Sequence, residues 1–505
     1  MSSTIAPGTS ASTRTKPSVP LPPTTLRPRA GHVEHRQLAR WQAYATIIVW
    51  LLILSIPFLW IRGGALQDLT TTWGTAISSL GSLFGLIASM MFLLQVLLLA
   101  RVPVFEIGFG RDGMIKAHKV IGMWSFYALL GHLVFLYFGY QMSTRVFDPD
   151  LGIYRGRSFG EMIGMFNAMG PSIAMAAVGT VLIVVPVILL SLKKIRSKMR
   201  YEVWHLWHMF SYIGILAALP HQVFAGPSFM ANQDLEFDWA AFYWFGIYVA
   251  AFACTAIYRV FLPLYRSHKY QVTVESVVPD GARGIDLRLT GKNLDKLGVR
   301  GGQFFTWRFL GSKGWVRGHP FSISTAPTAT SMSVAIRVVG DGTERIAGLE
   351  PGTKVLFEGP YGRVTGDMRT GNRLLMFGAG AGVGPMISIL QEQQWAPGEA
   401  ILFTREPVEA DTMMDADIRN LVNLRGLDHR PMFGGIPRGG STWLAPDEDG
   451  MAGDGVELIL ELTNNNDGDT DIYMCGPPPW MASVIRDLRK AGIPADKIHA
   501  EEFSF

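Results

Sequence analysis

The distribution of hydrophobic residues divides the chain into two halves of different character. Between residues 42 and 263, apolar residues form six stretches, each long enough to cross the ~30 Å hydrocarbon core of a bilayer as a helix. The stretches cover residues 42–62, 77–100, 118–140, 170–192, 203–225 and 239–263. This pattern predicts an all-α bundle of six transmembrane helices.

After Arg266 the hydrophobic residues follow a different pattern. Short segments of alternating apolar and polar residues are separated by Gly- and Pro-rich turns, as is typical of strands in a small antiparallel β-barrel. From Arg373 onward, strands alternate with helices, which predicts a parallel α/β sheet. The predicted barrel strands are Tyr270 to Val277, Ile285 to Leu289, Gln303 to Phe309, Met332 to Val339 and Lys354 to Glu358.

These patterns predict three domains after an N-terminal tail. Residues 1–40 are rich in Ser, Thr, Pro and Arg, which indicates a disordered segment, and residues 41–265 form the transmembrane domain. Residues 266–368 form the barrel, and residues 369–505 form the α/β domain. A basic, acid-poor tail is also typical of a transit peptide, but four prolines between residues 17 and 23 disfavour the amphipathic helix of such a peptide. No apolar segment follows the initiator, which argues against a cleaved secretory signal.

The composition fits a membrane half joined to a soluble half. Hydrophobic residues make up 49% of the 505 residues and charged residues 17%. The two cysteines, Cys254 and Cys475, are too few for a disulfide framework or for an iron–sulfur cluster held by four cysteines. Any electron transfer must therefore use other cofactors.

Basic residues in the loops orient the predicted helices. Lys and Arg cluster in residues 36–40, 111–119, 193–200 and 259–269, whereas the loops after the first and fifth helices contain almost none. The loop after the third helix is an exception, since Arg145, Arg155 and Arg157 occur there beside acidic residues. The alternation predicts that both termini lie in the cytoplasm.

Four histidines occur within the predicted membrane helices as two pairs. His118 and His132 are 14 residues apart in the third stretch, and His208 and His221 are 13 residues apart in the fifth. At ~1.5 Å per residue, these separations are about 21 and about 20 Å. Because the third and fifth helices run in the same direction, His118 and His208 would lie near the inner face. His132 and His221 would lie near the outer face.

Two imidazoles on opposite sides of one iron make a six-coordinate haem that transfers electrons. The alternative is that the histidines only line the bundle or hydrogen-bond to each other. Ionisable residues in membrane spans are uncommon and usually functional, and the alternative does not account for the matching depths of the two pairs. The pattern therefore predicts two haems, one above the other.

The fifth helix presents a geometric difficulty. At ~100° per residue, a 13-residue step leaves two side chains about 140° apart around an ideal helix. Pro220 precedes His221, and an internal proline kinks a helix, so we expect a distortion that re-aims His221. His205 competes with His208 for the inner site, but it is about 24 Å from His221 along the helix, a poorer match. We expect a hydrogen bond or a haem-propionate contact for His205.

The predicted barrel contains two short motifs that suit a flat, phosphorylated cofactor. In the segment His319-Pro320-Phe321-Ser322-Ile323-Ser324-Thr325, an aromatic residue can stack a ring system and the hydroxyls can bond to its edge. In Gly340-Asp341-Gly342-Thr343, exposed amides at a helix start and a hydroxyl suit a pyrophosphate. Each motif alone also occurs in ordinary strands and turns, and the order of the two strengthens the prediction.

Two further motifs lie in the predicted α/β domain. Gly378, Gly380, Gly382 and Pro385 follow a strand and precede a helix in the pattern Gly-x-Gly-x-Gly-x-x-Pro, which lets the backbone approach a phosphate. This pattern differs from the Gly-x-Gly-x-x-Gly dinucleotide fingerprint. A final strand from Asp471 to Met474 ends in Cys475-Gly476-Pro477, at the edge where doubly wound sheets bind ligands. The alternative for Cys475 is a small buried residue.

Taken in this order, the motifs resemble those of the ferric reductase/NADPH oxidase superfamily over nearly all of the chain after residue 40. The run Arg111-Asp112 ahead of His118 and the run Tyr201-Glu202-Val203-Trp204-His205-Leu206-Trp207-His208 resemble a bacterial-type ferric reductase transmembrane domain. The soluble half is similar to ferredoxin–NADP reductases. The resemblance implies FAD, two b-type haems and NADPH as cofactors, with NADH a less favoured alternative to NADPH.

The resemblance also implies a role for particular residues. His118, His132, His208 and His221 would ligate haem iron, and Cys475, Glu501 and Phe503 would border the nicotinamide and the flavin at hydride transfer. The implied cofactor-binding residues are His319, Pro320, Phe321, Ser322, Ser324, Gly342, Thr343, Gly378, Gly380, Gly382, Pro385, Arg405, Gly476 and Phe505. Two residues follow Phe503, so either Phe503 or Phe505 would cover the flavin. Arg405 favours NADPH, although Glu406 beside it weakens that preference.

The implied function is a transmembrane oxidoreductase of a plasma membrane that passes electrons from cytoplasmic NADPH through FAD and two haems to an acceptor on the far side. Ferric chelates are the first candidate acceptor, and dioxygen, a quinone or a partner protein are the alternatives. No calcium-binding EF-hand loop occurs in the sequence. A non-enzymatic channel or receptor with a degenerate reductase domain is the rival class, and the intact nucleotide motifs argue against it. No nucleic-acid partner is expected.

Overall fold

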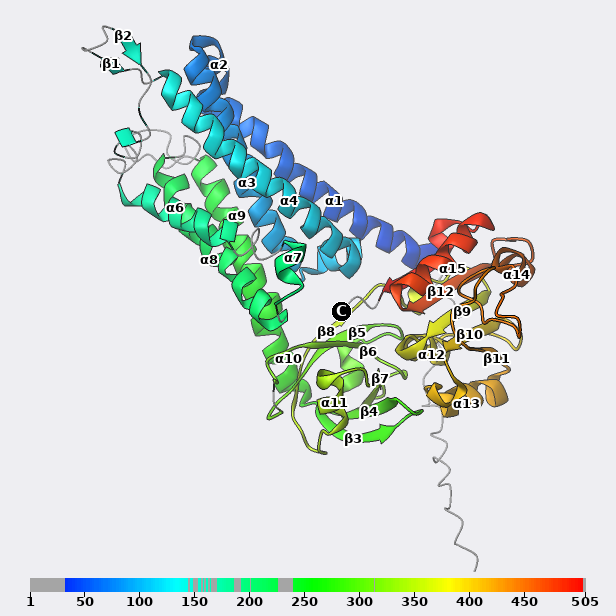
Figure 1. Ribbon diagram of the computed structural model, residues 1–505. Coiled ribbons are helices and arrows are strands. Elements are labelled where there is room, and N and C mark those ends of the chain that lie inside the picture. Colours follow the sequence, from blue (N-terminus) through cyan, green and yellow to red (C-terminus); the bar gives the residue numbers. More distant parts are fainter. Residues whose placement is uncertain are drawn as a thin grey trace, which may run out of the picture. The chain divides into compact units, whose positions relative to one another are not determined.

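The computed structural model describes residues 32–143, 146–148, 153–155, 158, 160, 161, 164, 170–185, 192–199, 201–225, 239–312 and 314–502. The predictions for residues 1–31, for Arg145 and Arg157, and for Phe503 and Phe505 lie outside this part of the chain. The chain divides into two compact units, one formed by Arg36–Arg266 and the other containing the residues from Ser267 onward (Figure 1).

The first unit is helical, and we call it the membrane unit. Its helices are α1 (His32–Trp60), η1 (Ile61–Ala65), α2 (Leu66–Thr71), α3 (Trp73–Leu99), α4 (Pro103–Ser143), α6 (Pro171–Val184), α7 (Lys193–Arg196), α8 (Tyr201–Ala225), α9 (Trp239–Ala256) and η3 (Ile257–Phe261), and α10 (Leu262–Tyr270) continues from it. A two-stranded antiparallel hairpin, β1 (Val146–Asp148) and β2 (Ile153–Arg155), follows α4.

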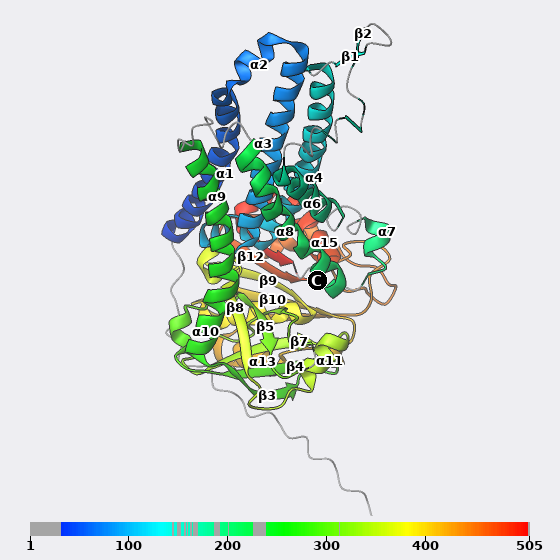
Figure 2. The ribbon, with the colours of Figure 1, turned by 90° about the vertical axis from the view of Figure 1, so that its left-hand side faces the viewer.

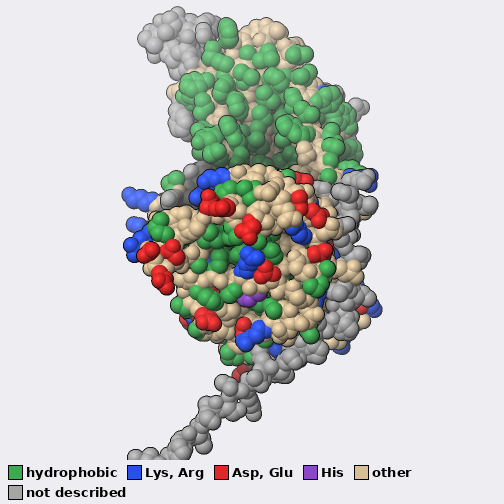
Figure 3. All heavy atoms as spheres, turned by 90° about the vertical axis from the view of Figure 1, so that its right-hand side faces the viewer, with side chains coloured by type: hydrophobic (Ala, Val, Ile, Leu, Met, Phe, Trp, Pro, Cys, Tyr) green, Lys and Arg blue, Asp and Glu red, His purple; other side chains and the backbone are tan. Residues whose placement is uncertain are grey.

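Four helical stretches of the described chain are long and apolar enough to cross a membrane: Gln37–Thr71, Trp73–Leu99, Gly113–Ser143 and Trp239–Tyr270. The remaining two predicted spans coincide with α6, whose described apolar part is shorter, and with α8, which has 25 residues. The prediction of transmembrane helices is therefore confirmed for four spans, and the six-helix bundle stays a prediction. Large apolar side chains cover the outside of this unit, whereas charged side chains are spread over the other (Figure 3).

Small residues bring the helices of the membrane unit close together. α3 and α4 lie side by side (Figure 2), and a Cβ atom added to Gly81 would lie 2.9 Å from the backbone N of Leu136. Similarly, a Cβ atom on Gly179 of α6 would lie 2.7 Å from the carbonyl oxygen of Gly214 on α8. Close backbone approach at small residues is the usual way in which membrane helices pack. It fixes the depth of α4 relative to α3, and of α6 relative to α8.

The second unit, which we call the soluble unit, begins with two three-stranded antiparallel sheets. Their strands are β3 (Thr273–Pro279), β4 (Gly284–Thr290) and β7 (Ser331–Arg337) in one sheet, and β6 (His319–Ser322), β5 (Phe304–Phe309) and β8 (Val355–Tyr361) in the other. Alternate residues of both sheets enter one core, which includes Leu287, Val334 and Trp307. A short helix, α11 (Asp341–Ala347), follows β7. The antiparallel strands were predicted, and their closure into a barrel stays a prediction.

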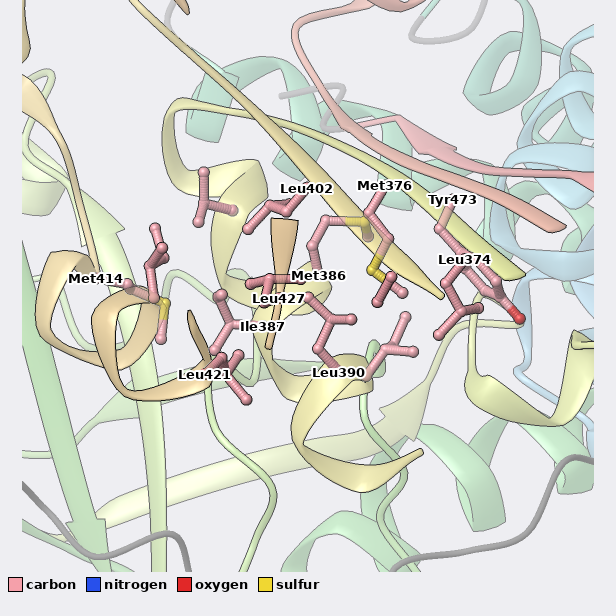
Figure 4. Packing of buried hydrophobic residues seen from close by; sticks show 14 of the residues in the cluster. Leu374, Met376, Met386, Ile387, Leu390, Leu402, Met414, Leu421, Leu427 and Tyr473 are labelled. Carbon is pink, nitrogen blue, oxygen red and sulfur yellow. The ribbon is translucent and has the colours of Figure 1, made fainter. Parts of the chain in front are cut away.

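The rest of the soluble unit is a parallel α/β sheet. Its order is β11-β10-β9-β12-β13, with strands β9 (Arg373–Ala379), β10 (Ala400–Glu406), β11 (Asp428–Phe433), β12 (Thr470–Gly476) and β13 (Ile498–Glu502). Its helices are α12 (Val383–Glu392), α13 (Asp415–Arg425), α14 (Gly455–Leu462) and α15 (Pro478–Lys490). Met386 and Leu390 of α12 pack against Met376 of β9 beneath the sheet (Figure 4). This packing fixes the start of α12 at the carboxyl edge of the strands.

Helix α12 also joins the α/β sheet to the antiparallel sheets. The Glu392 carboxylate accepts hydrogen bonds from Arg300 Nε at 2.6 Å and from the Gly301 amide at 2.8 Å. The Ser388 hydroxyl accepts a hydrogen bond from the Gly302 amide at 2.9 Å. These buried contacts hold the two parts of the soluble unit in one arrangement, so that sites at their boundary have a defined geometry.

Candidate functional site

The four membrane histidines form two facing pairs, one at each of two levels of α4 and α8. The ring centroids of His118 and His208 are 6.1 Å apart, and those of His132 and His221 are 6.3 Å apart. Metal–imidazole bonds are about 2.0–2.1 Å long, so two such bonds plus about 1 Å within each ring place two axial imidazole centroids roughly 6 Å apart. Both spacings therefore fit one metal ion between two imidazoles.

The hydrogen bonding of the histidines also fits axial ligation. Nδ1 of His132 lies 2.8 Å from the Gly81 carbonyl oxygen, which favours the tautomer with a proton on Nδ1 and a lone pair on Nε2. In His118, His208 and His221, Nδ1 is buried without a hydrogen-bond partner in the described structure. The described residues contain no group of three or more His, Cys, Asp or Glu that could hold a bare metal ion. Two histidines at each level therefore suit a metal whose other ligands come from a macrocycle.

Both histidines of α8 face a histidine of α4, although a 13-residue step on an ideal helix would leave their side chains about 140° apart. Pro220 lies inside α8 directly before His221, at the position where the sequence predicts a distortion. His205 is exposed, whereas the ring that faces His118 belongs to His208. The Trp204 ring stacks on His208 with a centroid distance of 5.1 Å. The structure thus brings together the histidines that the sequence paired.

A cavity of about 410 Å³ lies at the level of the second histidine pair. It is lined by His132, His221 and mostly apolar side chains of α3, α4, α6, α8 and α9, and by a few residues of α1, η1 and α2. A Cβ atom on Gly85 would lie 2.6 Å from Nδ1 of His132, so this glycine makes room for the ring. Gln222 donates a hydrogen bond to Ser89 at 2.8 Å and accepts one from the Tyr248 hydroxyl at 2.9 Å. Asp68 is the only Asp, Glu, Lys or Arg among the described lining residues.

The predicted flavin residues lie on β6 in the soluble unit. The rings of His319 and Phe321 are parallel, with an interplanar angle of 8° and a centroid distance of 6.0 Å. Trp307 of the adjacent strand donates its indole hydrogen to the Phe321 carbonyl at 3.2 Å, which fixes the strand. Ser322 and Ser324 are buried, and the Ser324 hydroxyl has no hydrogen-bond partner in the described structure. An aromatic platform beside an unsatisfied buried hydroxyl suits a ring system with polar edges.

The electrostatics around His319 suit an anion. Burial, together with the positive charges of Arg317, Arg345 and Arg308, lowers the pKa of His319 to about 4. His319 is therefore neutral at neutral pH, and three guanidinium groups act on its position. Gly342 leaves space there, since a Cβ atom on it would lie 3.2 Å from Cε1 of His319.

Thr343 caps α11. Its hydroxyl donates to the Gly340 carbonyl at 2.8 Å and accepts from the amides of Val339 and Gly340 at 2.9 and 3.2 Å. One donor and two acceptor positions are all that a hydroxyl offers. Thr343 therefore shapes the turn around Gly342, and a contact from its hydroxyl to a phosphate would require one of these bonds to break.

The glycine-rich turn has the close backbone packing that its sequence predicts. Gly380 has φ +58°, a conformation that favours glycine, and a Cβ atom on Gly382 would lie 2.1 Å from the Cys475 carbonyl oxygen. A Cβ atom on Gly378 would lie 2.9 Å from Cα of Val383. Pro385 lies in the first turn of α12, where its missing N–H has no intrahelical partner to lose. The turn therefore presents backbone and a helix start at the edge of the sheet.

The carboxyl ends of neighbouring strands bring the predicted nicotinamide residues to the same edge. Cys475 of β12 is paired in register with Gly378 on one side and with Glu501 of β13 on the other. The position of a Cβ atom on Gly362, just after β8, is 3.2 Å from both carboxylate oxygens of Glu501. A Cβ atom on Gly384 would lie 3.2 Å from Cβ of Ser324. The flavin and nucleotide motifs therefore meet across the boundary between the two kinds of sheet.

Arg405 lies near the end of β10, next to Glu406. The two side chains contact different groups. Arg405 donates hydrogen bonds to the carbonyl oxygens of Glu406 and Gly435, at 2.9 and 2.5 Å. Burial lowers the pKa of Arg405, and Glu406 opposes this effect. The Glu406 side chain is 2% exposed and forms an ion pair with Arg337 of β7 at 2.5 Å.

Sequence reasoning missed this ion pair and its neighbour, in which Arg283 contacts the Asp411 carboxylate. Arg337 and Glu406 are 69 residues apart, in different sheets, and belong to no motif. The one indication in the sequence was that Glu406 directly follows Arg405.

Comparison with known proteins agrees with this organisation. The family model "Ferric reductase like transmembrane component" matches residues 84–219. An electron transfer subunit described as a probable NAD(+)-dependent dihydroorotate dehydrogenase B, from Methanothermobacter thermautotrophicus, is 31% identical over 199 residues, 39% of this chain and 65% of that protein. Respiratory burst oxidase homolog protein D from Solanum tuberosum is 37% identical over 94 residues, 15% of this chain and 11% of that protein.

A flavohemoglobin from Malassezia yamatoensis with bound FAD and heme is a similar solved structure, with a TM-score of 0.41, 14% identity, and coverage of 83% of this chain and 96% of that one. The chain spans between about half and two thirds of the length of the first curated relatives that it matches.

The four long apolar helices and the match to a ferric-reductase-like transmembrane component define the class as an integral membrane protein. Residues 84–219 match the ferric-reductase-like transmembrane component, and the similarity to respiratory burst oxidase homologs supports a likeness to the ferric reductase/NADPH oxidase superfamily.

Proposed function

We propose that the protein is a transmembrane oxidoreductase that moves electrons from cytoplasmic NADPH to an acceptor on the far side of a plasma membrane, with FAD and two b-type haems as its cofactors. The observation that supports this most strongly is the presence of two facing histidine pairs at two levels of the same two helices. A six-span bundle and an FAD-binding barrel are parts of the same proposal.

When bound, FAD accepts two electrons as a hydride and each haem carries one electron at a time, and the protein supplies binding and orientation. His118 and His208 would hold the inner haem iron, and His132 and His221 the outer one. The Gly81 carbonyl oxygen favours the His132 tautomer with a proton on Nδ1, which would leave Nε2 to hold the metal. Gly85 keeps the space that this ring occupies.

In the soluble unit, the residues at the boundary between the sheets orient two planar rings and exclude water. Phe321 would support the flavin, and the amides of the glycine-rich turn would bind the NADPH pyrophosphate at the start of α12. Cys475, which is 1% exposed, and Glu501 would border the nicotinamide. Phe503 or Phe505 would cover the flavin ring in the absence of nicotinamide.

Ferric chelates are our first candidate for the acceptor, and dioxygen is the second. The cavity lined by His132 and His221 is the observation that supports dioxygen. Ferric citrate and similar chelates are anionic, whereas the described residues that line the cavity include Asp68 and no Lys or Arg. A small neutral acceptor enters such a lining without electrostatic cost. Reduction of dioxygen would yield superoxide.

A comparison of acceptors tests the proposal. Purified full-length protein in lipid nanodiscs is expected to show flavin absorption and low-spin haem bands, and to consume NADPH. Rates are measured with ferric citrate under anaerobic conditions, and in air with superoxide dismutase as a control. A rate that is the same with and without iron would remove ferric chelates as the main acceptor. Absence of haem and flavin bands would contradict the proposed function and would favour a non-enzymatic membrane protein.

A further inference from the structure

The strongest unexplained feature of the soluble unit is the buried charge network around Glu406. Glu406 is the last residue of β10. Arg405, directly before it, is paired in register with Ala379 of β9, so this end of β10 lies next to the glycine-rich turn that follows β9. In doubly wound folds this position decides between nucleotides, since a carboxylate accepts from a ribose 2′-hydroxyl and a cation accommodates a 2′-phosphate. Here a cation and a carboxylate, Arg405 and Glu406, occupy adjacent positions, so that the sequence alone gives opposite indications.

The structure separates the surroundings of these two side chains. Glu406 is 2% exposed, and one of its carboxylate oxygens lies 2.5 Å from a guanidinium nitrogen of Arg337. The same nitrogen of Arg337 donates to the Asp411 carbonyl oxygen at 3.0 Å. Arg337 Nε lies 3.5 Å from the position of a Cβ atom on Gly380, so the guanidinium fills the space between the glycine-rich turn and Glu406.

The charges of this network balance without Arg405. Arg283 pairs with the Asp411 carboxylate and Arg337 pairs with Glu406, which gives two positive and two negative groups. Arg405 bonds to backbone carbonyl oxygens. Its positive charge is therefore left to act on a ligand at the edge of the sheet. Burial raises the pKa of Glu406 to about 7 even though the charge and hydrogen bond of Arg337 act in the opposite direction, so this position disfavours an ionised carboxylate.

We propose that Arg337, a residue of the antiparallel sheets, sets the nucleotide preference of the α/β sheet. By holding the Glu406 carboxylate in an ion pair, it removes the negative charge that would repel a 2′-phosphate bound at Arg405. Arg337 is thus a positioning residue for NADPH specificity, and it acts through Glu406. This inference rests on the proposed function, because it assigns the selectivity of the same nucleotide site.

The test compares two adenosine nucleotides as probes. Binding of adenosine 2′,5′-bisphosphate and of 5′-AMP to the full-length protein is measured by titration calorimetry, and anaerobic flavin reduction by NADPH and by NADH is followed by stopped flow. At a pH well above the raised pKa of Glu406, where the carboxylate stays ionised without its partner, R337Q is expected to lower the ratio of the two affinities and the ratio of the two kcat/KM values about tenfold, since an unpaired carboxylate near a phosphate at a partly exposed site costs this order of magnitude.

R283Q is the matched control. It removes the same charge from the same network, but Arg283 is 59% exposed and contacts Asp411 rather than Glu406, so its ratios are expected to stay within about twofold of the wild type. R337K keeps the charge and is expected to keep most of the NADPH preference.

The double variant R337Q/E406Q removes both partners and leaves no buried unpaired charge, so it keeps the test informative if R337Q does not fold. Its ratios are expected to return to within about twofold of the wild type. Ratios that stay as low as in R337Q would show that Arg337 acts on the phosphate directly, and would overturn the inference. Unchanged ratios in R337Q would overturn it as well. If the wild type bound neither probe and neither NADPH nor NADH reduced the flavin, the proposed function itself would fail.

Discussion

At the scale of single residues, polar groups in apolar surroundings are the features that the sequence reveals best. The four histidines are visible in the sequence because ionisable residues are rare in membrane helices, and the structure brings them together as the pairs that helical spacing predicts. The Arg337–Glu406 pair is not visible, because two charged residues in a soluble segment are common and only the fold brings them together. The Thr343 hydroxyl shows a third case, since the structure assigns it to a helix cap.

Gly85 provides a test of the outer histidine pair at this scale. In G85A, the added Cβ atom would lie 2.6 Å from Nδ1 of His132, so the ring must move and the outer site should lose its haem. We expect about half of the haem to be lost, as measured by the pyridine haemochrome assay per polypeptide. G246A is the control, because a Cβ atom on this helical glycine of α9 meets nothing within 4 Å. Full haem content in G85A would contradict the assignment of this site.

His319 gives a prediction for the dependence of stability on pH. Burial and three arginines lower its pKa to about 4 in the folded state, whereas in the unfolded chain its pKa is near the ordinary histidine value of 6.5. Between these values the unfolded state binds more protons, so stability is lost as the pH falls from 6.5 towards 4. We expect H319Q to abolish about 1 kcal/mol of the acid-induced loss between pH 7.5 and 5, after discounting for solvent screening of the partly exposed ring.

Thermal unfolding of the flavin-free wild type and of H319Q at both pH values measures this difference. An equal loss of stability in the two proteins between pH 7.5 and 5 would show that His319 is not the group responsible.

At the scale of elements, periodicity predicted most of the helices and strands, and long-range contacts decided the rest. The four long apolar helices and the antiparallel strands follow from hydrophobic runs and from alternation. The break in α4 at Gly110, where φ is +69°, could not be placed from the apolar pattern because the residues around it are of mixed polarity. The turn after β9 was predicted because glycines between a strand and a helix let the backbone approach a phosphate, and the structure adds that Gly382 packs closely on β12.

Helix α12 gives a prediction about the boundary between the two kinds of sheet. Glu392 and Arg300 form an ion pair at 2.6 Å with side chains 9% and 12% exposed, so E392A leaves a nearly buried arginine with one carboxylate fewer. Removal of one partner of a buried pair costs about 3–5 kcal/mol. We expect a lower unfolding temperature of the soluble unit, together with weaker flavin retention, followed by flavin fluorescence on heating.

E461A on the exposed face of α14 is the matched control for this variant, and we expect it to unfold within about 1 °C of the wild type, since surface substitutions are usually near neutral. If E392A unfolded at the same temperature as E461A, the contact would not hold the boundary together.

At the scale of the whole molecule, the sequence predicted two halves with different chemistry, and the fold divides into two compact units after Arg266. The membrane unit contains the paired histidines, and the soluble unit contains the glycine-rich turn and the strand with Phe321. Composition could predict this division because a membrane helix and a half-buried strand require different spacings of apolar residues. It could not predict the acceptor, because the cavity beside His132 and His221 is lined by side chains of several helices that only the fold brings together.

The central claim is that each histidine pair holds one haem. The most direct measurement is the haem content per polypeptide of H132L/H221L and of H118L/H208L, in full-length protein whose correct insertion is verified by protease protection. The account predicts that each double variant retains one haem where the wild type has two, and that NADPH still reduces the flavin in both variants. A haem content that does not change in either variant would contradict the account.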